Sequence, residues 1–507
     1  MNEELVENIK KKINEKETEI KAIWETINEI KESPKQNMIE ELKGIKRTTG
    51  QHPGGLLITL PNIDIQKYTP LNYPADNRQS EWMTTHFEYS FLSKTFLKVD
   101  ILGHDEPTVL QKLFQLTHKD PLEISFQDEK VMAVFTQADT LGIPEFGTDF
   151  VKRSLLTPLK PTKFSQLVQI SGFSHGTDVW TQNQQTIYKN KELALNELIA
   201  CREDIWNFLV LWGVDKKRAF IATEYIRKKE LGWEKLAPDI KEEIKSKLND
   251  REGELYFSIL SKIKYIFPKP HAIAYTMTAW RTAFYKVYHP HAFYSTLLTY
   301  HGTTYDIWMM TLNSDTILFR LDNLLDNLNT YKGNEKELFS IIKVLEELNK
   351  EKKRIQKTPS VNLPKLEIEK ILLNVHQKIT NLKDPRLNQI LRRNGYAWKL
   401  TAKEKGLLFT LKVILEMEIK GFGFKRGIDF NQSEVKNFKI ENNTIYFPFT
   451  AITGIGDKVA EKIMTCRQTQ GKITANWKKE LTGLLNINHL QQLENLQKYN
   501  LLINLEN

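Results

Sequence analysis

The spacing of hydrophobic and polar residues divides the chain into stretches of different expected structure. Residues 3–46 place apolar side chains three and four positions apart among charged ones, with no breaker before Pro34, which predicts a helical arm. From residue 48 to about residue 108, short apolar runs between turn residues predict strands. Helical spacing dominates from there to residue 300. It returns after Thr401, where a short β-like stretch precedes one more helix.

Residues 311–400 differ from the rest of the chain in composition and in the spacing of their apolar residues. They are rich in lysine, asparagine and leucine, and their helical spacing is weak. This pattern predicts either a helical insertion or a loosely packed region, and it indicates no function. The chain shows no internal repeat of the kind that predicts a solenoid.

Composition narrows the class of protein. The 507 residues are too many for one hydrophobic core, so two to four domains are expected. With 40% hydrophobic and 27% charged residues, and no apolar stretch long enough to span a bilayer, the chain is typical of globular proteins without a membrane partner. The first residues lack the apolar core of a signal peptide, which predicts a cytoplasmic location. Two cysteines are too few for a disulfide framework or a cysteine-rich zinc site.

The charge balance permits a polyanionic partner without identifying one. The formal net charge is +9 and the pI about 9.0. Lysine, asparagine and isoleucine are all plentiful, as in proteins from AT-rich genomes. The excess of lysine therefore weakens the argument from charge to nucleic acid.

The phrase LKVDILGHDEPTV places one acid inside an apolar run. Val99 and Ile101 predict a buried strand, and the carboxylate of Asp100 within it is costly unless it is paired or holds a metal. The residues alone leave two alternatives open, a Mg²⁺ ligand or a partner for one arginine. Asp105 is expected to cap the following helix, with Glu106 as an acid in its first turn.

Two phrases in the strand-rich part carry candidate contacts. In RTTGQHPGGLLI, Arg47, Gln51 and His52 precede a glycine pair and can contact a phosphate or a base edge, although a tight surface turn explains the same residues. In EWMTTHFEYS, His86 stands among aromatic residues, where a half-buried side chain is a commoner explanation than a metal or substrate ligand.

Two further phrases in the helical part suit a nucleotide. QISGFSHGTDVW presents His175 and Thr177 on an expected glycine-containing loop, which fits a phosphate or equally a capped connection between helices. SKIKYIFPKPHAIAYTMTAWRTAFYKVYHP alternates aromatics with cations that include Lys264, Lys269 and His271. Cations that reach phosphates beside rings that stack a base indicate a nucleotide-binding surface. The alternative is an amphipathic core helix whose lysines reach water.

The phrase AITGIGDKVAEKIM predicts a tight hairpin followed by a helix. Gly454 and Gly456 form the turn, the helix begins near Asp457, and Lys458 adds charge. Backbone N–H groups at a helix start make an anion site that reads no base sequence. The phrase resembles the helix-hairpin-helix module that grips one phosphate strand of duplex DNA, although such turns also occur without a ligand. The helix is expected to turn Val459, Ala460 and Ile463 inward.

Together these phrases resemble one family, the alpha subunit of bacterial replicative DNA polymerase III, and within it the PolC type. The resemblance covers most of residues 47–300 and 401–465, and residues 311–400 lie outside it. The phrases occur in the family's order: RTTGQHPGGLLI, YPADNRQSEWMTTHF, LKVDILGHDEPT, LGIPEFGTDFV, LVQISGFSHGTDVW, CREDIW, KIKYIFPKPHAIAY, AKEKGLL and FTAITGIGDKVA.

The resemblance implies a mainly α, multi-domain fold with a small mixed α/β palm portion. That palm is incomplete and similar to nucleotidyltransferases of the polymerase β type. The implied domains are a helical arm ending the thumb (1–46), the second part of the palm (47–115), helical fingers (116–310), a helical insertion of unknown role (311–400), and a duplex-binding region (401–507) with a helix-hairpin-helix near 451–464.

The resemblance also implies a reaction, template-directed DNA synthesis from dNTPs by two-metal phosphoryl transfer. Asp100 corresponds to the third metal aspartate, which anchors the Mg²⁺ that activates the primer 3′-hydroxyl. The other two form an Asp-x-Asp pair in the family, and this chain has no such pair. The chain alone is therefore expected to be inactive, and its missing half can be a separate polypeptide. The implied contacts are His175, Thr177, Arg202, Lys264, Lys269 and His271 around the dNTP, and Arg47, Gln51, His52, Gly454, Gly456 and Lys458 on primer-template DNA.

Other hypotheses remain open at this stage. The chain can be a non-catalytic DNA-binding scaffold, a fragment of a split or frameshifted polymerase gene, or a decayed gene product. Contact with a sliding clamp is also open, because the stretch QLENL at residues 492–496 is a poor match to the family's clamp-binding peptide and is expected to be helical.

Overall fold

The computed structural model describes residues 40–43, 50–101, 103–227, 232–248, 251–328, 332–355, 366–382 and 400–505. The chain forms two compact units, unit 1 up to His104 and unit 2 from Asp105 onward. The helical arm predicted over residues 1–46 lies outside the described residues, apart from 40–43. In the part of the chain that is described, no helix has the length and apolar character needed to cross a membrane.

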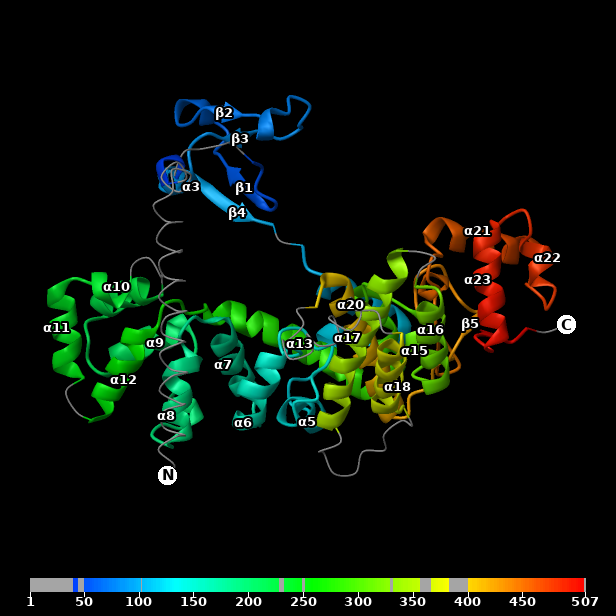
Figure 1. Cartoon of the computed structure of the whole chain (residues 1–507). Coiled ribbons are helices and arrows are strands. Elements are labelled where there is room, and N and C mark those ends of the chain that lie inside the picture. Colours follow the sequence, from blue (N-terminus) through cyan, green and yellow to red (C-terminus); the bar gives the residue numbers. More distant parts are fainter. Residues whose placement is uncertain are drawn as a thin grey trace, which may run out of the picture. The chain divides into compact units, whose positions relative to one another are not determined.

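Unit 1 contains two small antiparallel sheets of two strands each (Figure 1). Strand β1 (Gly55–Ile58) pairs with β4 (Leu97–Asp100), and β2 (Leu71–Asn72) pairs with β3 (Thr84–Thr85). One short helix, α3 (Tyr89–Leu92), precedes β4. The strands predicted for this part of the chain are therefore present, but they are short.

The prediction of a buried strand around Asp100 is wrong. Strand β4 forms, yet Leu97 is 63% and Ile101 62% exposed, and Asp100 is itself exposed. The physical reason is that the sheet has only two strands in the described part of unit 1. An apolar run is buried only where other elements cover it, and the run itself does not encode that cover.

Unit 2 is mostly helical, as expected for the fold class. In its described residues, four short strands form two pairs, β5 (Ile428–Asp429) with β8 (Leu502–Ile503) and β6 (Lys439–Glu441) with β7 (Thr444–Tyr446). Its helices are α4 (Glu106–Thr117), α5 (Glu129–Thr136), α6 (Thr157–Leu159), α7 (Phe164–His175), α8 (Gln185–Lys189), α9 (Arg202–Leu211), α10 (Lys216–Ile226), α11 (Pro238–Lys247), α12 (Arg251–Lys262), α13 (Lys269–Tyr288), α14 (Pro290–His301), α15 (Ile307–Met310), α16 (Ser314–Asp326), α17 (Lys332–Ile355), α18 (Ile368–Asn381), α20 (Ala402–Ile419), α21 (Asp457–Gln470), α22 (Trp477–Leu481) and α23 (Ile487–Lys498).

Helix α13 is central to the packing of unit 2, because α4, α5, α7 and α14 all contact it. Trp280 is 1% exposed, stacks on Phe135 with ring centroids 6.0 Å apart, and donates its indole N–H to the Ser125 carbonyl at 2.8 Å. Such rings bury large apolar areas and fix the orientation of the helix.

Two local predictions in unit 2 need correction. Gln169–His175 was expected in a loop but forms the end of α7, because Ile170 and Phe173 are fully buried in the core that α7 shares with α13. Asp105 does occupy the N-cap position of α4, but its side chain makes no capping hydrogen bond. Glu106 lies in the first turn, as predicted.

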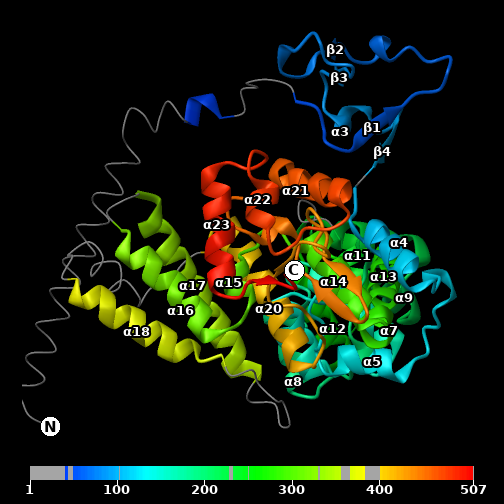
Figure 2. The same cartoon turned by 90° about the vertical axis from the view of Figure 1, so that its right-hand side faces the viewer.

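The described part of residues 311–400 is helical and well packed. Helices α16, α17 and α18 lie against one another, and α17 also packs on α20 (Figure 2). Their facing residues, among them Leu338, Leu345 and Ile371, are fully buried. The described part of this segment is therefore helical, as predicted, and it is not loosely packed.

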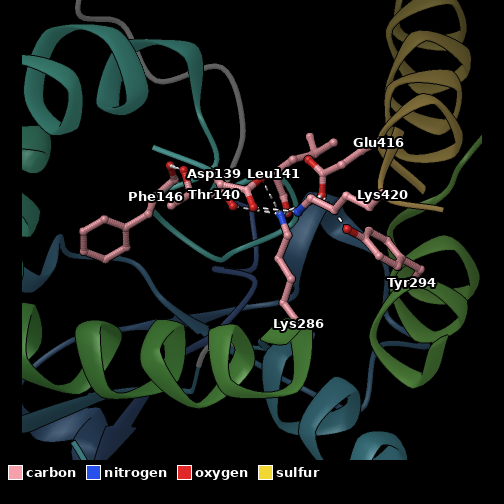
Figure 3. Close-up of polar contacts among 8 residues, drawn as sticks. All are labelled: Asp139, Thr140, Leu141, Phe146, Lys286, Tyr294, Glu416 and Lys420. Carbon is pink, nitrogen blue, oxygen red and sulfur yellow. Dashed lines mark hydrogen bonds and ion pairs between the residues drawn. The ribbon is translucent and has the colours of Figure 1, made fainter. Parts of the chain in front are cut away.

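A buried polar cluster ties α20 to α13 and α14 (Figure 3). The ammonium of Lys286, whose side chain is 2% exposed, lies 2.8 Å from Glu416 and 3.4 Å from Asp139. It also donates to the carbonyls of Asp139 and Leu141 at 2.8 and 3.0 Å. Lys420 is 2.6 Å from Asp139, and Tyr294 donates to Glu416 at 2.7 Å.

The charges of this cluster cancel, two lysines against two carboxylates. Burial raises the pKa of Asp139, but the attraction of Lys286 and Lys420 outweighs it and holds that pKa below its ordinary value. Burial alone would lower the pKa of Lys420, and the charges of Glu416 and Asp139 raise it instead. A buried, fully paired network of this kind fixes the elements it joins, because removing one member leaves an uncompensated charge.

Candidate functional site

Three segments of unit 2 that are distant in sequence meet around residues 264–269. The N–H of Thr177 donates to the Tyr265 carbonyl at 2.8 Å, and the N–H of Arg202 donates to the Phe267 carbonyl at 2.9 Å. The connection between α12 and α13 therefore lies between the loop after α7 and the start of α9. The structure thus brings together all six residues expected around a dNTP: His175, Thr177, Arg202, Lys264, Lys269 and His271.

Four side chains of this group, three cations and one imidazole, already contact a carboxylate. We call these four side chains and their acids the charge cluster. Its contacts are His175–Glu145 at 2.8 Å, Arg202–Glu203 at 2.6 Å, Lys264–Asp178 at 2.7 Å and Lys269–Asp204 at 2.6 Å.

Sequence reasoning missed all four acids. Asp178 follows Thr177 directly, and Glu203 follows Arg202, so closeness in sequence was an available signal for these two. Glu145 is thirty residues from His175 and gave no such signal.

The pKa shifts in the charge cluster follow from these pairings. The hydrogen bond to Glu145 raises the pKa of His175 above its ordinary value, against the opposing effect of burial. Burial lowers the pKa of Lys269, but the hydrogen bond from its ammonium to Asp204 outweighs this and the pKa is raised. Burial also raises the pKa of the Cys201 thiol next to the cluster. Cys201 is therefore protonated and unreactive, and it plays a packing role.

Aromatic rings lie beside the charge cluster. The rings of His175 and Phe267 stack with centroids 4.6 Å apart, and Tyr275 continues the stack at 6.3 Å from each. His271 adds a fourth ring, 6.4 Å from Tyr275. Cations that neutralise phosphate next to a row of rings give an arrangement that can hold a nucleotide by charge and by stacking.

In unit 1, strand pairing joins two of the sequence-predicted sites. Gly55 lies opposite Asp100 in the register of β1 and β4. The imidazole Nδ1 of His52 accepts from the N–H groups of Gly54 and Gly55 at 3.1 and 2.6 Å, so His52 holds the glycine turn beside Asp100. A Cβ on Gly55 would lie 2.8 Å from the Lys98 side chain and 3.1 Å from the Asp100 carboxylate. The glycine therefore leaves room for these two side chains.

Asp100 supplies suitable chemistry for Mg²⁺ but too few ligands. Its carboxylate is 44% exposed, and one oxygen lies 2.8 Å from the ammonium of Lys98. Among the described residues, no group of three or more His, Cys, Asp or Glu side chains could hold a metal. Because Mg²⁺ requires about six oxygens, Asp100 can contribute one ligand, and the others must come from DNA, dNTP, water or polypeptide outside the described residues. Of the two sequence alternatives, ion pairing occurs, with a lysine in place of the arginine.

The remaining candidates in unit 1 make few contacts that define a site. Gln51 is exposed, and Arg47 lies outside the described residues. The Nδ1 atom of His86 is 2.9 Å from the Asn72 amide, and its ring packs edge-on against Phe87. His86 is exposed, however, so the half-buried side chain considered for it is not found.

The hairpin before α21 forms as the sequence predicts. Gly454 has φ +85°, a conformation that favours glycine, and Gly456 caps the helix that starts at Asp457. Ala460 and Ile463 are fully buried, so the helix faces inward as expected, and Lys458 is exposed beside the hairpin. The first N–H groups of α21 point out of the N-terminal end of the helix, where an anion can accept hydrogen bonds from them.

Comparisons with protein families assign most of these segments. The model of the bacterial DNA polymerase III alpha NTPase domain matches residues 1–103, and that of the alpha subunit finger domain matches residues 106–248. The helix-hairpin-helix motif matches residues 426–503, which include the hairpin before α21.

The chain is also similar to curated PolC-type DNA polymerase III enzymes. The chain is 35% identical to the PolC-type DNA polymerase III of Bacillus subtilis over 85% of its own length, and 34% identical to that of Halalkalibacterium halodurans over 84%. It is 31% identical to the PolC-type enzyme of Streptococcus sanguinis over 91% of its length. The matches span 26%, 25% and 28% of these relatives, so the chain corresponds to about a quarter of each. By its matched segments and its relatives, the chain is similar to a portion of the alpha subunit of bacterial DNA polymerase III, PolC type.

Proposed function

We propose that the chain is the part of a template-directed DNA polymerase that binds the incoming dNTP and the primer-template duplex, in a reaction that uses Mg²⁺. The observation that carries this proposal is the meeting of His175, Arg202, Lys264 and Lys269 beside a row of aromatic rings. Fixed cations offset the charge of a triphosphate, and rings stack on a base. The hairpin before α21 adds a backbone grip on duplex DNA.

The domain roles in this proposal follow the family resemblance. Residues 47–115 serve as the second part of the palm, 116–310 as fingers and 401–507 as the duplex-binding region, with 1–46 ending the thumb. Within the described part of residues 311–400, helix α17 packs against α20. A sliding-clamp contact through residues 492–496 is disfavoured, because they lie within α23 and Leu493 and Leu496 are buried.

Asp100 is proposed as one carboxylate ligand of a catalytic Mg²⁺. When bound, Mg²⁺ supplies Lewis-acid stabilisation of the charge that builds up during phosphoryl transfer. The contribution of this chain is to fix the carboxylate on β4, with His52 and Gly55 shaping the turn opposite. Lys98 pairs with Asp100 in the described structure and has to release that carboxylate for the metal to bind.

Primer extension with a complementing polypeptide tests this function. The full chain is mixed with the remaining portion of a PolC-type relative, such as that of Bacillus subtilis, on a primed template with dNTPs and Mg²⁺. The chain alone should give no extension, because it lacks the Asp-x-Asp pair. The mixture should extend the primer, and Asp100→Asn should reduce that extension at least a hundredfold.

Asp105→Asn is the matched control, since Asp105 is an exposed acid five residues away that makes no capping bond. Its activity in the mixture should equal that of the unmodified chain. Extension by highly purified chain alone would contradict the proposal, as would full activity of Asp100→Asn in the mixture.

One observation favours a second candidate, a DNA-binding scaffold without catalysis. The described residues hold no complete metal site, and Asp100 is engaged by Lys98. A scaffold would bind primer-template DNA with unchanged affinity after Asp100→Asn and would never support extension with any complementing portion.

A further inference from the structure

The cations of the charge cluster are already paired in the absence of a nucleotide. Arg202, Lys264 and Lys269 each face a carboxylate at 2.6–2.7 Å, and the imidazole of His175 faces a fourth at 2.8 Å. A triphosphate brings several negative charges, and a cation already neutralised by a carboxylate attracts it weakly. At least one internal acid must therefore give up its partner before the cations can act on phosphate.

Two of the four acids are held in place by backbone groups. Asp204 accepts from the N–H groups of Ala200 and Cys201 at 3.2 and 2.8 Å. Glu203 accepts from the N–H of Lys269 at 2.7 Å. Displacing either carboxylate would leave these N–H groups unsatisfied, so both acids belong to the fixed structure of the site.

Asp178 is held differently. Within the described part of the chain, the contact made by its carboxylate is the one with the Lys264 ammonium, at 2.7 Å. Both side chains reach water, with 35% of Asp178 and 59% of Lys264 exposed. An exposed pair of this kind is weak, so its exchange for a more highly charged anion is favourable.

The backbone beneath this pair is fixed independently of it. The N–H of Thr177 donates to Tyr265, and the N–H of Lys264 donates back to the Thr177 carbonyl at 3.1 Å. The Asn183 amide donates to the Asp178 carbonyl at 2.8 Å. The two side chains can therefore separate while the loop and the segment opposite keep their places.

We infer that Asp178 is an internal competitor of the incoming triphosphate, holding Lys264 until phosphate replaces it. This inference rests on the proposed dNTP site and adds a residue that lowers its affinity for anions. Each anion that uses Lys264 has to displace the same carboxylate, so the competitor lowers the affinity for all such anions by the same factor. Asp178 thus sets the anion affinity of the site by acting through Lys264.

Asp178→Asn tests the inference with little risk to folding. Asp178 has φ +57°, a left-handed conformation that asparagine also tolerates well. Binding of dATP and of inorganic tripolyphosphate to the full chain is measured by calorimetry at low salt, without and with Mg²⁺. The variant should bind both probes about three- to tenfold more tightly than the unmodified chain. Binding of monophosphate should tighten by the same factor, since the competitor lowers the affinity of every anion that uses Lys264 equally.

Asp239→Asn is the matched control. Asp239 is an exposed acid on α11 of the same unit, and its carboxylate lies 3.2 Å from the Arg218 guanidinium. Its replacement by asparagine changes the net charge by the same amount as Asp178→Asn. Its affinities should stay within about twofold of those of the unmodified chain. In a Lys264→Met background, Asp178→Asn should lose most of its effect, because the competitor acts through that lysine.

Each remaining outcome decides a different point. If the unmodified chain and Asp178→Asn both fail to bind either probe while keeping their helical circular dichroism, the proposed triphosphate site is wrong. If the unmodified chain binds and Asp178→Asn binds equally, only the competitor is overturned. If Asp178→Asn weakens binding of dATP in the presence of Mg²⁺, Asp178 contacts the metal, which also overturns the competitor.

Discussion

In unit 1, apolar side chains reach the surface, whereas in unit 2 they form a continuous core. Of the 27 large hydrophobic residues that are exposed in the described part of the chain, thirteen lie in unit 1, although unit 2 is several times longer. Leu92 and Phe96 are the buried hydrophobic residues of the described part of unit 1. Unit 2 buries more than ninety, on nearly every helix.

This difference indicates where each unit obtains its stability. A two-stranded sheet is marginally stable by itself, so β1 and β4 depend on contacts beyond those that the described residues of unit 1 make with one another. Unit 2 buries enough apolar surface to be stable as a helical body. Variants in unit 2 should therefore affect stability, and matched variants in unit 1 should affect it little.

Two tryptophans provide the strongest test of this contrast. Trp280 is 1% exposed and Trp82 is 55% exposed. Trp280→Ala should lower the free energy of unfolding by about 3–5 kcal/mol, because it removes a stacked, hydrogen-bonded ring from the core. Trp82→Ala should cost under about 1 kcal/mol. Urea unfolding followed by circular dichroism measures both. Equal losses would mean that unit 1 has a core of its own and that the contrast is wrong.

The buried polar cluster of unit 2 gives the next largest effect. Lys286→Met should cost about 3 kcal/mol, because it leaves the partly buried carboxylates of Asp139 and Glu416 with Lys420 as the one remaining cation of the cluster. Lys350→Met is the control: this lysine pairs with Glu347 at 2.6 Å, but it is 63% exposed. Its loss should stay within about 0.5 kcal/mol. The same urea titration applies, and a stable Lys286→Met variant would show that the cluster does not tie α20 to α13.

The contrast between the two units also shows which features the sequence could predict and which it could not. Spacing of apolar residues predicts helices, as for α21 with Ala460 and Ile463 buried, because helix periodicity is a local property. Burial around Asp100 was predicted wrongly, since it depends on elements that lie beside the strand. Three acids of the charge cluster, Glu145, Asp178 and Asp204, were missed for the same reason, because the meeting of distant segments decides which cation each one reaches.

Duplex binding provides a test of intermediate size, since the hairpin before α21 belongs to unit 2 alone. Gly454→Ala should cost about 1–2 kcal/mol, because φ is +85° and a Cβ would meet the Gln492 side chain at 2.6 Å. Duplex DNA affinity should fall about three- to tenfold with it, as measured by fluorescence anisotropy at low salt.

Gly471→Ala is the matched control for the hairpin, because Gly471 has φ +80° at the other end of α21 and a Cβ there has nothing within 4 Å. Its DNA affinity should be unchanged. Trp82→Ala in unit 1 should also leave duplex binding unchanged. A loss with Trp82→Ala as large as with Gly454→Ala would show that duplex binding is shared between the units.

The smallest expected effect concerns an ion pair that only the tertiary structure of unit 2 creates. His175 and Glu145 are thirty residues apart, whereas the Lys98–Asp100 pair of unit 1 joins neighbours on one strand. Because the folded-state pKa of His175 is raised above its ordinary 6.5, its stabilisation is fully present below that pH. It is lost as pH rises through the folded value.

Glu145→Gln should remove this pH-dependent term, while its amide oxygen can still accept a hydrogen bond from the imidazole. The unmodified chain should therefore exceed Glu145→Gln in stability by more at pH 6.0 than at pH 8.5. The difference should stay under about 1 kcal/mol, since both side chains are partly open to water. In a His175→Asn background, Glu145→Gln should have the same effect at both pH values, because the titrating partner is gone. If the difference still depends on pH in the His175→Asn background, another group causes the effect. The His175–Glu145 pair would then not stabilise the fold as proposed, and the contrast with the local Lys98–Asp100 pair would be lost.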